Sequence, residues 1–232
     1  MKEAVEIYER LSAAANGVGL ACRGGFVIQP DDGLPEVSMG HPSRTLVLLG
    51  FTGRMQWPAF AASAEFADGE LNPLDRWSTR LIGQLGAACG ARPLYPFGGP
   101  PWWPFQRWAQ RAETLHPSPL GILMHPTFGL WHAYRGALLF SEEFALPLRM
   151  PSVSPCESCM GKPCITSCPA GAVTTMGFAR SACAAHVASP NGIACRSGCL
   201  SRGRCPVAVP HRYGGEQARF YMRQLSDQGR AR

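Results

Sequence analysis

CESCMGKPCITSCPAGAV (residues 156–173) places four cysteines within thirteen positions and follows the last of them with a proline. Eight of the ten cysteines in the chain lie between residues 156 and 205, whereas the first 155 residues contain only two. A chain of 232 residues buries roughly 70–75% of its unfolded surface and does not need disulfides for stability. The crowding therefore predicts a local site built from sulfur, and it decides the fold expected for the last third of the chain.

The spacing of these cysteines is typical of iron–sulfur binding. The first group reads Cys156-x2-Cys159-x4-Cys164-x3-Cys168-Pro169, and the second reads Cys183, then Cys195-x3-Cys199-x5-Cys205-Pro206. The first group resembles the bacterial ferredoxin pattern C-x2-C-x2-C-x3-C-P, with two extra residues in the middle gap. In that pattern the last cysteine of each run ligates the other cluster. The resemblance implies two [4Fe–4S] clusters, one held by Cys156, Cys159, Cys164 and Cys205, the other by Cys168, Cys183, Cys195 and Cys199.

Two other uses of the same cysteines remain open. Two zinc ions with four cysteines each would also suit the CxxC spacing. A disulfide framework would suit an oxidising compartment, but the acidic N-terminus lacks the apolar stretch of a secretory signal, so we expect a reducing cytoplasm. Cys22 and Cys89 lie in apolar segments, and we expect both to be ordinary buried thiols.

Charge and hydropathy narrow the range of partners. The formal net charge is +6, and two clusters with their thiolates would lower it to about +2. The basic residues are scattered, so we do not expect nucleic acid to be a partner. No apolar run reaches the roughly 18 residues of a spanning helix, so we expect no membrane segment.

The pattern of apolar residues predicts an α+β protein of two domains. Residues 1–150 are expected to form a mixed α/β domain, with helices over 3–15, 73–90 and 105–115 and strands over 25–29, 44–50, 120–124 and 137–140. Asn72 is the expected N-cap of the second helix, and Pro73 its first residue. Residues 151–232 are expected to form a small ferredoxin-like domain that closes with a helix over 214–227.

One segment of the first domain resembles known families. HPTFGLWHAYRG (125–136) looks like the HP-x-[FY]-G-x-W-x-A-x-R-G segment of the cobalamin-processing proteins of vitamin B12 trafficking. It is similar, more distantly, to a segment of epoxyqueuosine reductase, in which a nitroreductase-like cobalamin domain precedes a two-cluster domain. The resemblance implies a nitroreductase-like fold that holds cobalamin, or alternatively a flavin. The implied cofactor-binding residues are His125, Phe128, Gly129, Trp131 and Arg135.

Structural roles for these residues stand beside the cofactor roles. Aromatic side chains such as Trp131 commonly pack in a core, Arg135 can form a salt bridge, and His125 before a proline can belong to a turn. The stretch 100–113 has no carboxylate where epoxyqueuosine reductase carries its catalytic aspartate, and the helical-repeat extension of that enzyme is not expected here. We therefore assign no catalytic residue, and we do not expect epoxide reduction on tRNA.

The leading hypothesis is an iron–sulfur redox protein that passes electrons from two clusters to a cofactor in the first domain, with cobalamin favoured. It would be an oxidoreductase if that site is occupied. Its partners would be an electron donor protein or reductase, and a small-molecule substrate or thiol cosubstrate. The alternatives are a non-catalytic electron carrier whose first domain docks a partner, and a zinc-stabilised interaction module.

Overall fold

The computed structural model describes residues 2–230, with side chains from residue 6 to residue 225, and it divides into two compact units. Unit 1 comprises Met1–Thr114 and His132–Pro151, and unit 2 comprises Leu115–Trp131 and Ser152–Arg232. The expected first domain, residues 1–150, included the segment 115–131. That segment instead packs with the cysteine-rich part of the chain, because Leu120, Met124 and Leu130 are buried in one core with Val173 and Cys205.

Unit 1 is built on a four-stranded antiparallel sheet with the strand order β1-β2-β4-β3. The strands are β1 (Ala21–Val27), β2 (Thr45–Thr52), β3 (Arg92–Leu94) and β4 (His132–Phe140). Strand β2 is buried along almost its whole length, because it lies between β1 and β4 and has apolar residues on both faces. The expected α+β class is confirmed.

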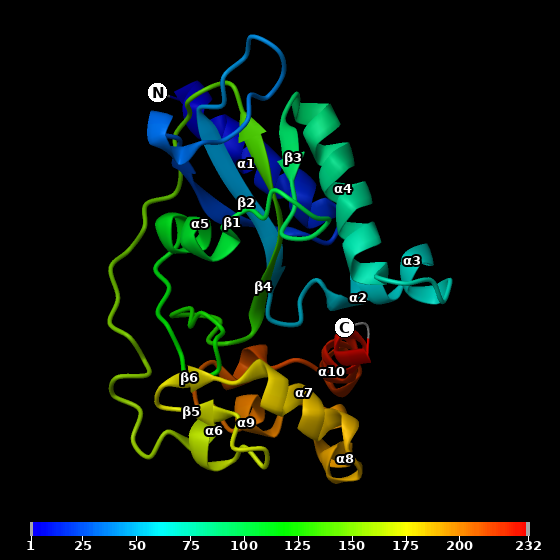
Figure 1. Ribbon diagram of the computed structural model, residues 1–232. Coiled ribbons are helices and arrows are strands. Elements are labelled where there is room, and N and C mark those ends of the chain that lie inside the picture. The colour runs from blue at the N-terminus through cyan, green and yellow to red at the C-terminus, as the bar shows by residue number, and fades with distance from the viewer. Residues whose placement is uncertain (1, 231–232) are drawn as a thin grey trace. The chain divides into compact units, whose positions relative to one another are not determined.

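Helices cover both faces of this sheet. They are α1 (Lys2–Gly17), α2 (Trp57–Ala61), α3 (Ala64–Ala67), α4 (Pro73–Cys89) and α5 (Phe105–Ala112), with a 3-10 turn at Pro30–Asp32. Helices α1 and α4 contact each other behind the sheet, and α5 packs against β1 and β2 in front of it (Figure 1). Helix α4 begins at Pro73 and ends at Gly90 in the left-handed conformation, as expected. The expectation that the Asn72 side chain caps this helix was wrong, because its backbone is left-handed and its side chain makes no capping hydrogen bond.

A buried ion pair ties β1 to the end of α5. Arg23 is 1% exposed and donates to both carboxylate oxygens of Glu113, at 3.0 and 2.8 Å. It also donates to the carbonyl of Phe51 at 2.7 Å, and its guanidinium lies over the ring of Tyr134. A charge this deeply buried requires its partner.

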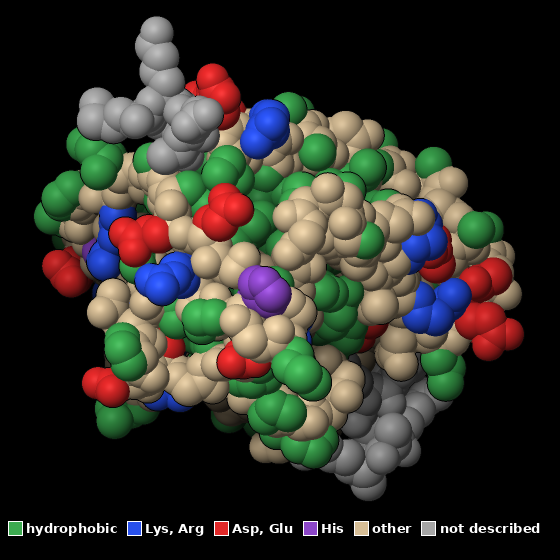
Figure 2. All heavy atoms as spheres, turned by 90° about the horizontal axis from the view of Figure 1, so that it is seen from above, with side chains coloured by type: hydrophobic (Ala, Val, Ile, Leu, Met, Phe, Trp, Pro, Cys, Tyr) green, Lys and Arg blue, Asp and Glu red, His purple; other side chains and the backbone are tan. Residues whose placement is uncertain are grey.

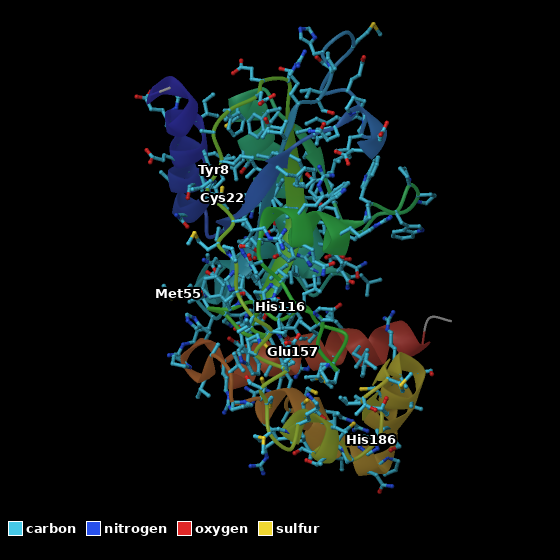
Figure 3. All side chains as sticks on the ribbon, turned by 90° about the vertical axis from the view of Figure 1, so that its left-hand side faces the viewer. Tyr8, Cys22, Met55, His116, Glu157 and His186 are labelled. Atoms are coloured by element: carbon cyan, nitrogen blue, oxygen red, sulfur yellow. The ribbon has the colours of Figure 1, made fainter. Side chains whose placement is uncertain are left out.

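Helix α1 is fastened to β1 beside the thiol of Cys22. The Gly24 N–H donates to the Tyr8 hydroxyl at 3.2 Å, and Tyr8 and Cys22 lie side by side (Figure 3). Burial, with a contribution from Cys89, raises the pKa of Cys22 to about 12. Cys89 itself is exposed, which corrects the expectation that both thiols are buried: it is the last residue of α4, just before the Gly90 cap.

Unit 2 contains short elements joined by turns. They are β5 (Val173–Thr174), β6 (Gly177–Phe178), α6 (Pro163–Thr166), α7 (Arg180–Ala188), α8 (Ile193–Arg196), α9 (Leu200–Gly203) and α10 (Gly215–Arg230), with 3-10 turns at Pro190–Gly192 and Val209–His211. Helix α10 agrees with the expected closing helix. The strand expected over 120–124 is absent, because Gly121 has φ +69° and its N–H closes a turn onto the Ser118 carbonyl.

The surface carries charges of both signs. On the face shown in Figure 2, Lys and Arg side chains lie among Asp and Glu side chains and do not gather into one basic patch. Within the described residues, no helix combines the length and the apolar character that crossing a membrane would require.

We expect Glu113→Gln to lower the free energy of unfolding of unit 1 by about 3 kcal/mol, because it leaves the buried Arg23 charge without its carboxylate. Asp68→Asn is the matched control. It breaks the Arg76–Asp68 pair, whose side chains are 37% and 35% exposed, and it should lower the free energy of unfolding much less than Glu113→Gln does. Urea unfolding of the two variants measures the difference, and equal losses would contradict the role given to Arg23.

Candidate functional site

Four cysteines of unit 2 form a group that we call the first tetrad: Cys156, Cys159, Cys164 and Cys205. Burial raises the pKa of Cys156, and the thiols of Cys205, Cys164 and Cys159 raise it further. All four line one cavity, together with apolar side chains such as Leu120 and Leu130. The first tetrad therefore combines residues from both ends of the cysteine-rich region.

The other four cysteines form the second tetrad: Cys168, Cys183, Cys195 and Cys199. Burial, with the three neighbouring thiols of this tetrad, raises the pKa of Cys183 to about 11. Cys195 forms a small core with Val187 of α7 and Met222 of α10, and Cys183 and Cys199 pack against it. Each tetrad brings together the members of one ligand set implied by the sequence.

Hydrogen bonds converge on the sulfur atoms of the second tetrad. Burial acts to raise the pKa of Cys168, but hydrogen bonds from the Ser201 hydroxyl and from three backbone N–H groups lower it overall. The Arg202 N–H points at the Cys199 sulfur, with an N–S distance of 3.5 Å. Such donors stabilise a thiolate, which is the form that binds a metal.

The thiols are grouped but are not bonded to one another. All ten cysteines, which lie in the described part of the chain, are free thiols, so the disulfide framework does not occur in this structure. In the same part of the chain, no three His, Cys, Asp or Glu side chains converge closely enough to hold one metal ion.

The segment 125–129 forms a tight turn in unit 2. The backbone N–H of His125 donates to the Gly129 carbonyl at 2.8 Å, and the reverse bond measures 2.9 Å. His125 Nδ1 accepts from the N–H groups of Thr127 and Phe128, at 3.0 and 3.1 Å. Phe128 packs against His211 with ring centroids 5.1 Å apart. The structure thus shows these expected cofactor residues as parts of a turn.

Trp131 supports an arginine that the sequence analysis did not select. Trp131 is buried, and the guanidinium of Arg202 lies 4.6 Å from its ring centroid and 4.5 Å from that of Tyr213. Arg202 also donates to the Leu130 carbonyl. The available signal was the position of Arg202 between Cys199 and Cys205, but spacing alone does not show which way an arginine points.

Arg135 lies in the other unit, on β4. It forms an ion pair with Asp75, donates to the Ser78 hydroxyl at 3.0 Å and stacks over Phe97 at 5.0 Å. These contacts correspond to the salt-bridge alternative. The five expected cofactor residues are therefore divided between the two units.

Comparisons with known proteins identify no family. No protein-family model and no curated protein matches the chain. Among solved structures, the chain is similar to a C. elegans B12-trafficking protein, CblC, described as a human MMACHC homologue. The match covers 99% of this chain and 96% of that one, with 14% sequence identity and a TM-score of 0.46. Similarity at this level does not carry a ligand or an activity from one protein to the other.

We expect Gly129→Ala to destabilise unit 2 by more than about 2 kcal/mol. Its φ is +57°, and a Cβ there would lie 2.9 Å from Ala208 Cβ and 3.0 Å from the Val207 oxygen. Gly171→Ala is the control, because Gly171 has φ +60° with nothing within 4 Å, and it should cost about 1 kcal/mol for the backbone conformation alone. Thermal unfolding compares the two, and equal midpoints would show that close packing at Gly129 is unimportant.

Proposed function

We propose that this protein is an iron–sulfur redox protein in which each tetrad holds one [4Fe–4S] cluster, giving a ferredoxin-like unit that carries single electrons. The observation that carries the proposal is the division of eight thiols into two sets of four, with Cys205 joining the first set and Cys168 joining the second. This interleaving is typical of two-cluster ferredoxins, in which the last cysteine of each run crosses over.

The residues present fit such a group. Thiols that are half-buried beside other thiols resist ionisation, so a cationic metal centre is needed to stabilise four thiolates together. When bound, a [4Fe–4S] cluster supplies a one-electron couple whose potential depends on burial and on hydrogen bonds to sulfur. Here Leu120 and Leu130 would exclude water from the first site, and Ser201 would donate to a ligand of the second. Electrons would enter from a donor protein or reductase.

We further propose that cobalamin, or alternatively a flavin, accepts these electrons. The support is the resemblance of residues 125–136 to the cobalamin-processing proteins. His125 is engaged in a turn and Arg135 in an ion pair. That same engagement favours the second candidate, an electron carrier whose unit 1 docks a partner.

The ligand sets can be tested by removing one thiol at a time. We expect wild-type protein purified without oxygen to contain about eight iron and eight inorganic sulfide per chain. Cys164→Ala and Cys183→Ala should each lose about half of both, and should destabilise unit 2, because metal binding contributes to its folding. Cys89→Ala, at an exposed cysteine outside both tetrads, is the control and should lose none.

Elemental analysis with a sulfide assay distinguishes the alternatives. Two zinc ions per chain without sulfide would establish the zinc-stabilised module in place of the redox protein. Full iron and sulfide in Cys164→Ala would show that the ligand set is wrong.

The acceptor can be tested by supplying cobalamin or flavin during anaerobic purification. Stoichiometric co-elution of either, with its absorbance spectrum, would support the enzyme candidate. A cluster-loaded protein that retains neither would support the carrier.

A further inference from the structure

Two arginines flank Cys205 without a carboxylate to balance them. Arg202 donates to the Leu130 carbonyl, and Leu130 lines the same cavity as the four thiols of the first tetrad. Arg212 donates to the carbonyl of Cys205 at 2.8 Å. The Nε atoms of both are shielded from solvent and have no hydrogen-bond partner in the described residues.

Both arginines are half-buried, and a guanidinium is permanently charged, so a counter-charge beside them would stabilise them. In the part of the chain that the structure describes, neither Arg202 nor Arg212 forms an ion pair with Asp or Glu. The acidic residues are scarce here, since residues 152–232 contain ten Lys or Arg and three Asp or Glu. The rings of Trp131 and Tyr213 stabilise the Arg202 cation, but they supply no formal charge.

We propose that Arg202 and Arg212 are positioning cations for the first tetrad, whose counter-charge is the thiolate-ligated cluster at Cys205, and that they raise its reduction potential. The inference rests on the proposed function and deepens it. The geometry that carries it is the hydrogen bond from Arg212 to the Cys205 carbonyl and the one from Arg202 to the carbonyl of Leu130, a residue that lines the cavity of the first tetrad.

The expected direction follows from the charge balance. One electron from a donor increases the negative charge of a [4Fe–4S] centre with four thiolates from −2 to about −3. A nearby fixed cation stabilises the more negative state, so it makes the potential less negative. Trp131 then has a physical role: it holds Arg202 beside Leu130, in place of forming the wall of a cofactor site.

The test is a dithionite redox titration of the anaerobically purified full chain, followed by electron paramagnetic resonance. We expect Arg202→Gln to make reduction of one cluster about tenfold less favourable, a shift of about 59 mV to more negative potential for a one-electron couple. Arg212→Gln should shift the same signal in the same direction. The shifted signal should be the one that Cys164→Ala loses, and the other cluster should keep its potential.

Two further variants separate charge from structure. Arg204→Gln removes the same charge from an exposed arginine next to Cys205, where solvent and salt screen it, so it should shift the potential little. Arg202→Lys retains the charge and should stay near the wild-type potential. Arg202→Lys tests the inference even if Arg202→Gln folds poorly. If the reduction potential of Arg202→Lys shifts by about the 59 mV expected for Arg202→Gln, charge is excluded as the cause.

The outcomes distinguish this inference from the proposed function. Wild-type protein without iron and sulfide would overturn both. Cluster-loaded Arg202→Gln and Arg212→Gln with wild-type potentials would overturn the inference alone, as would Arg204→Gln shifting as far as Arg202→Gln.

Discussion

Four thiolates cannot share one partly buried site unless positive charge is placed among them, and the organisation of unit 2 depends on this constraint. Burial and the neighbouring thiols raise the pKa values of Cys156, Cys164 and Cys183, so these three thiols favour the neutral form unless positive charge lies beside them. Cysteines also belong to both small cores of the unit, Cys205 in one and Cys195 in the other. A unit with such short elements has little other apolar material to bury, and a metal centre would then act as part of its core.

The two units differ in how the positive charges of their arginines are balanced. In unit 1, the carboxylate of Glu113 neutralises the charge of Arg23, and a carbonyl and a hydroxyl accept further hydrogen bonds from it. In unit 2, Arg202 and Arg212 have carbonyl and aromatic neighbours but no acidic partner among the described residues. Under the proposed function, the cluster of the first tetrad would supply the negative charge that balances these two arginines.

Local signals in the sequence predicted much of this arrangement. The apolar run within 44–50 indicated β2, and Pro73 and Gly90 marked the ends of α4. The resemblance to the ferredoxin pattern, with its crossing cysteines, implied the two sets of four thiols that interact in the structure. The predictions that were wrong concerned residues whose structure depends on contacts with residues distant in the sequence. Residues 120–124 are as apolar as a strand, but Gly121 turns the chain, and the cysteine core takes up Leu120 and Met124. The contacts of Arg202 with Leu130, Trp131 and Tyr213 join segments that are distant in the sequence. No local sequence pattern could predict these contacts.

The segment 115–131 lies between α5 and β4 in the sequence but belongs to unit 2. It leaves unit 1 after α5 and returns at Trp131, directly before β4, whose first residue His132 pairs with Thr52 of β2. Gly129 must also stay small to fit against Val207 and Ala208, which follow the Cys205-Pro206 ending of the cysteine region. Gly129, which belongs to the segment that resembles a cofactor motif, is therefore required by packing in unit 2. A packing constraint and the resemblance coincide at this residue, so its identity alone does not indicate a cofactor.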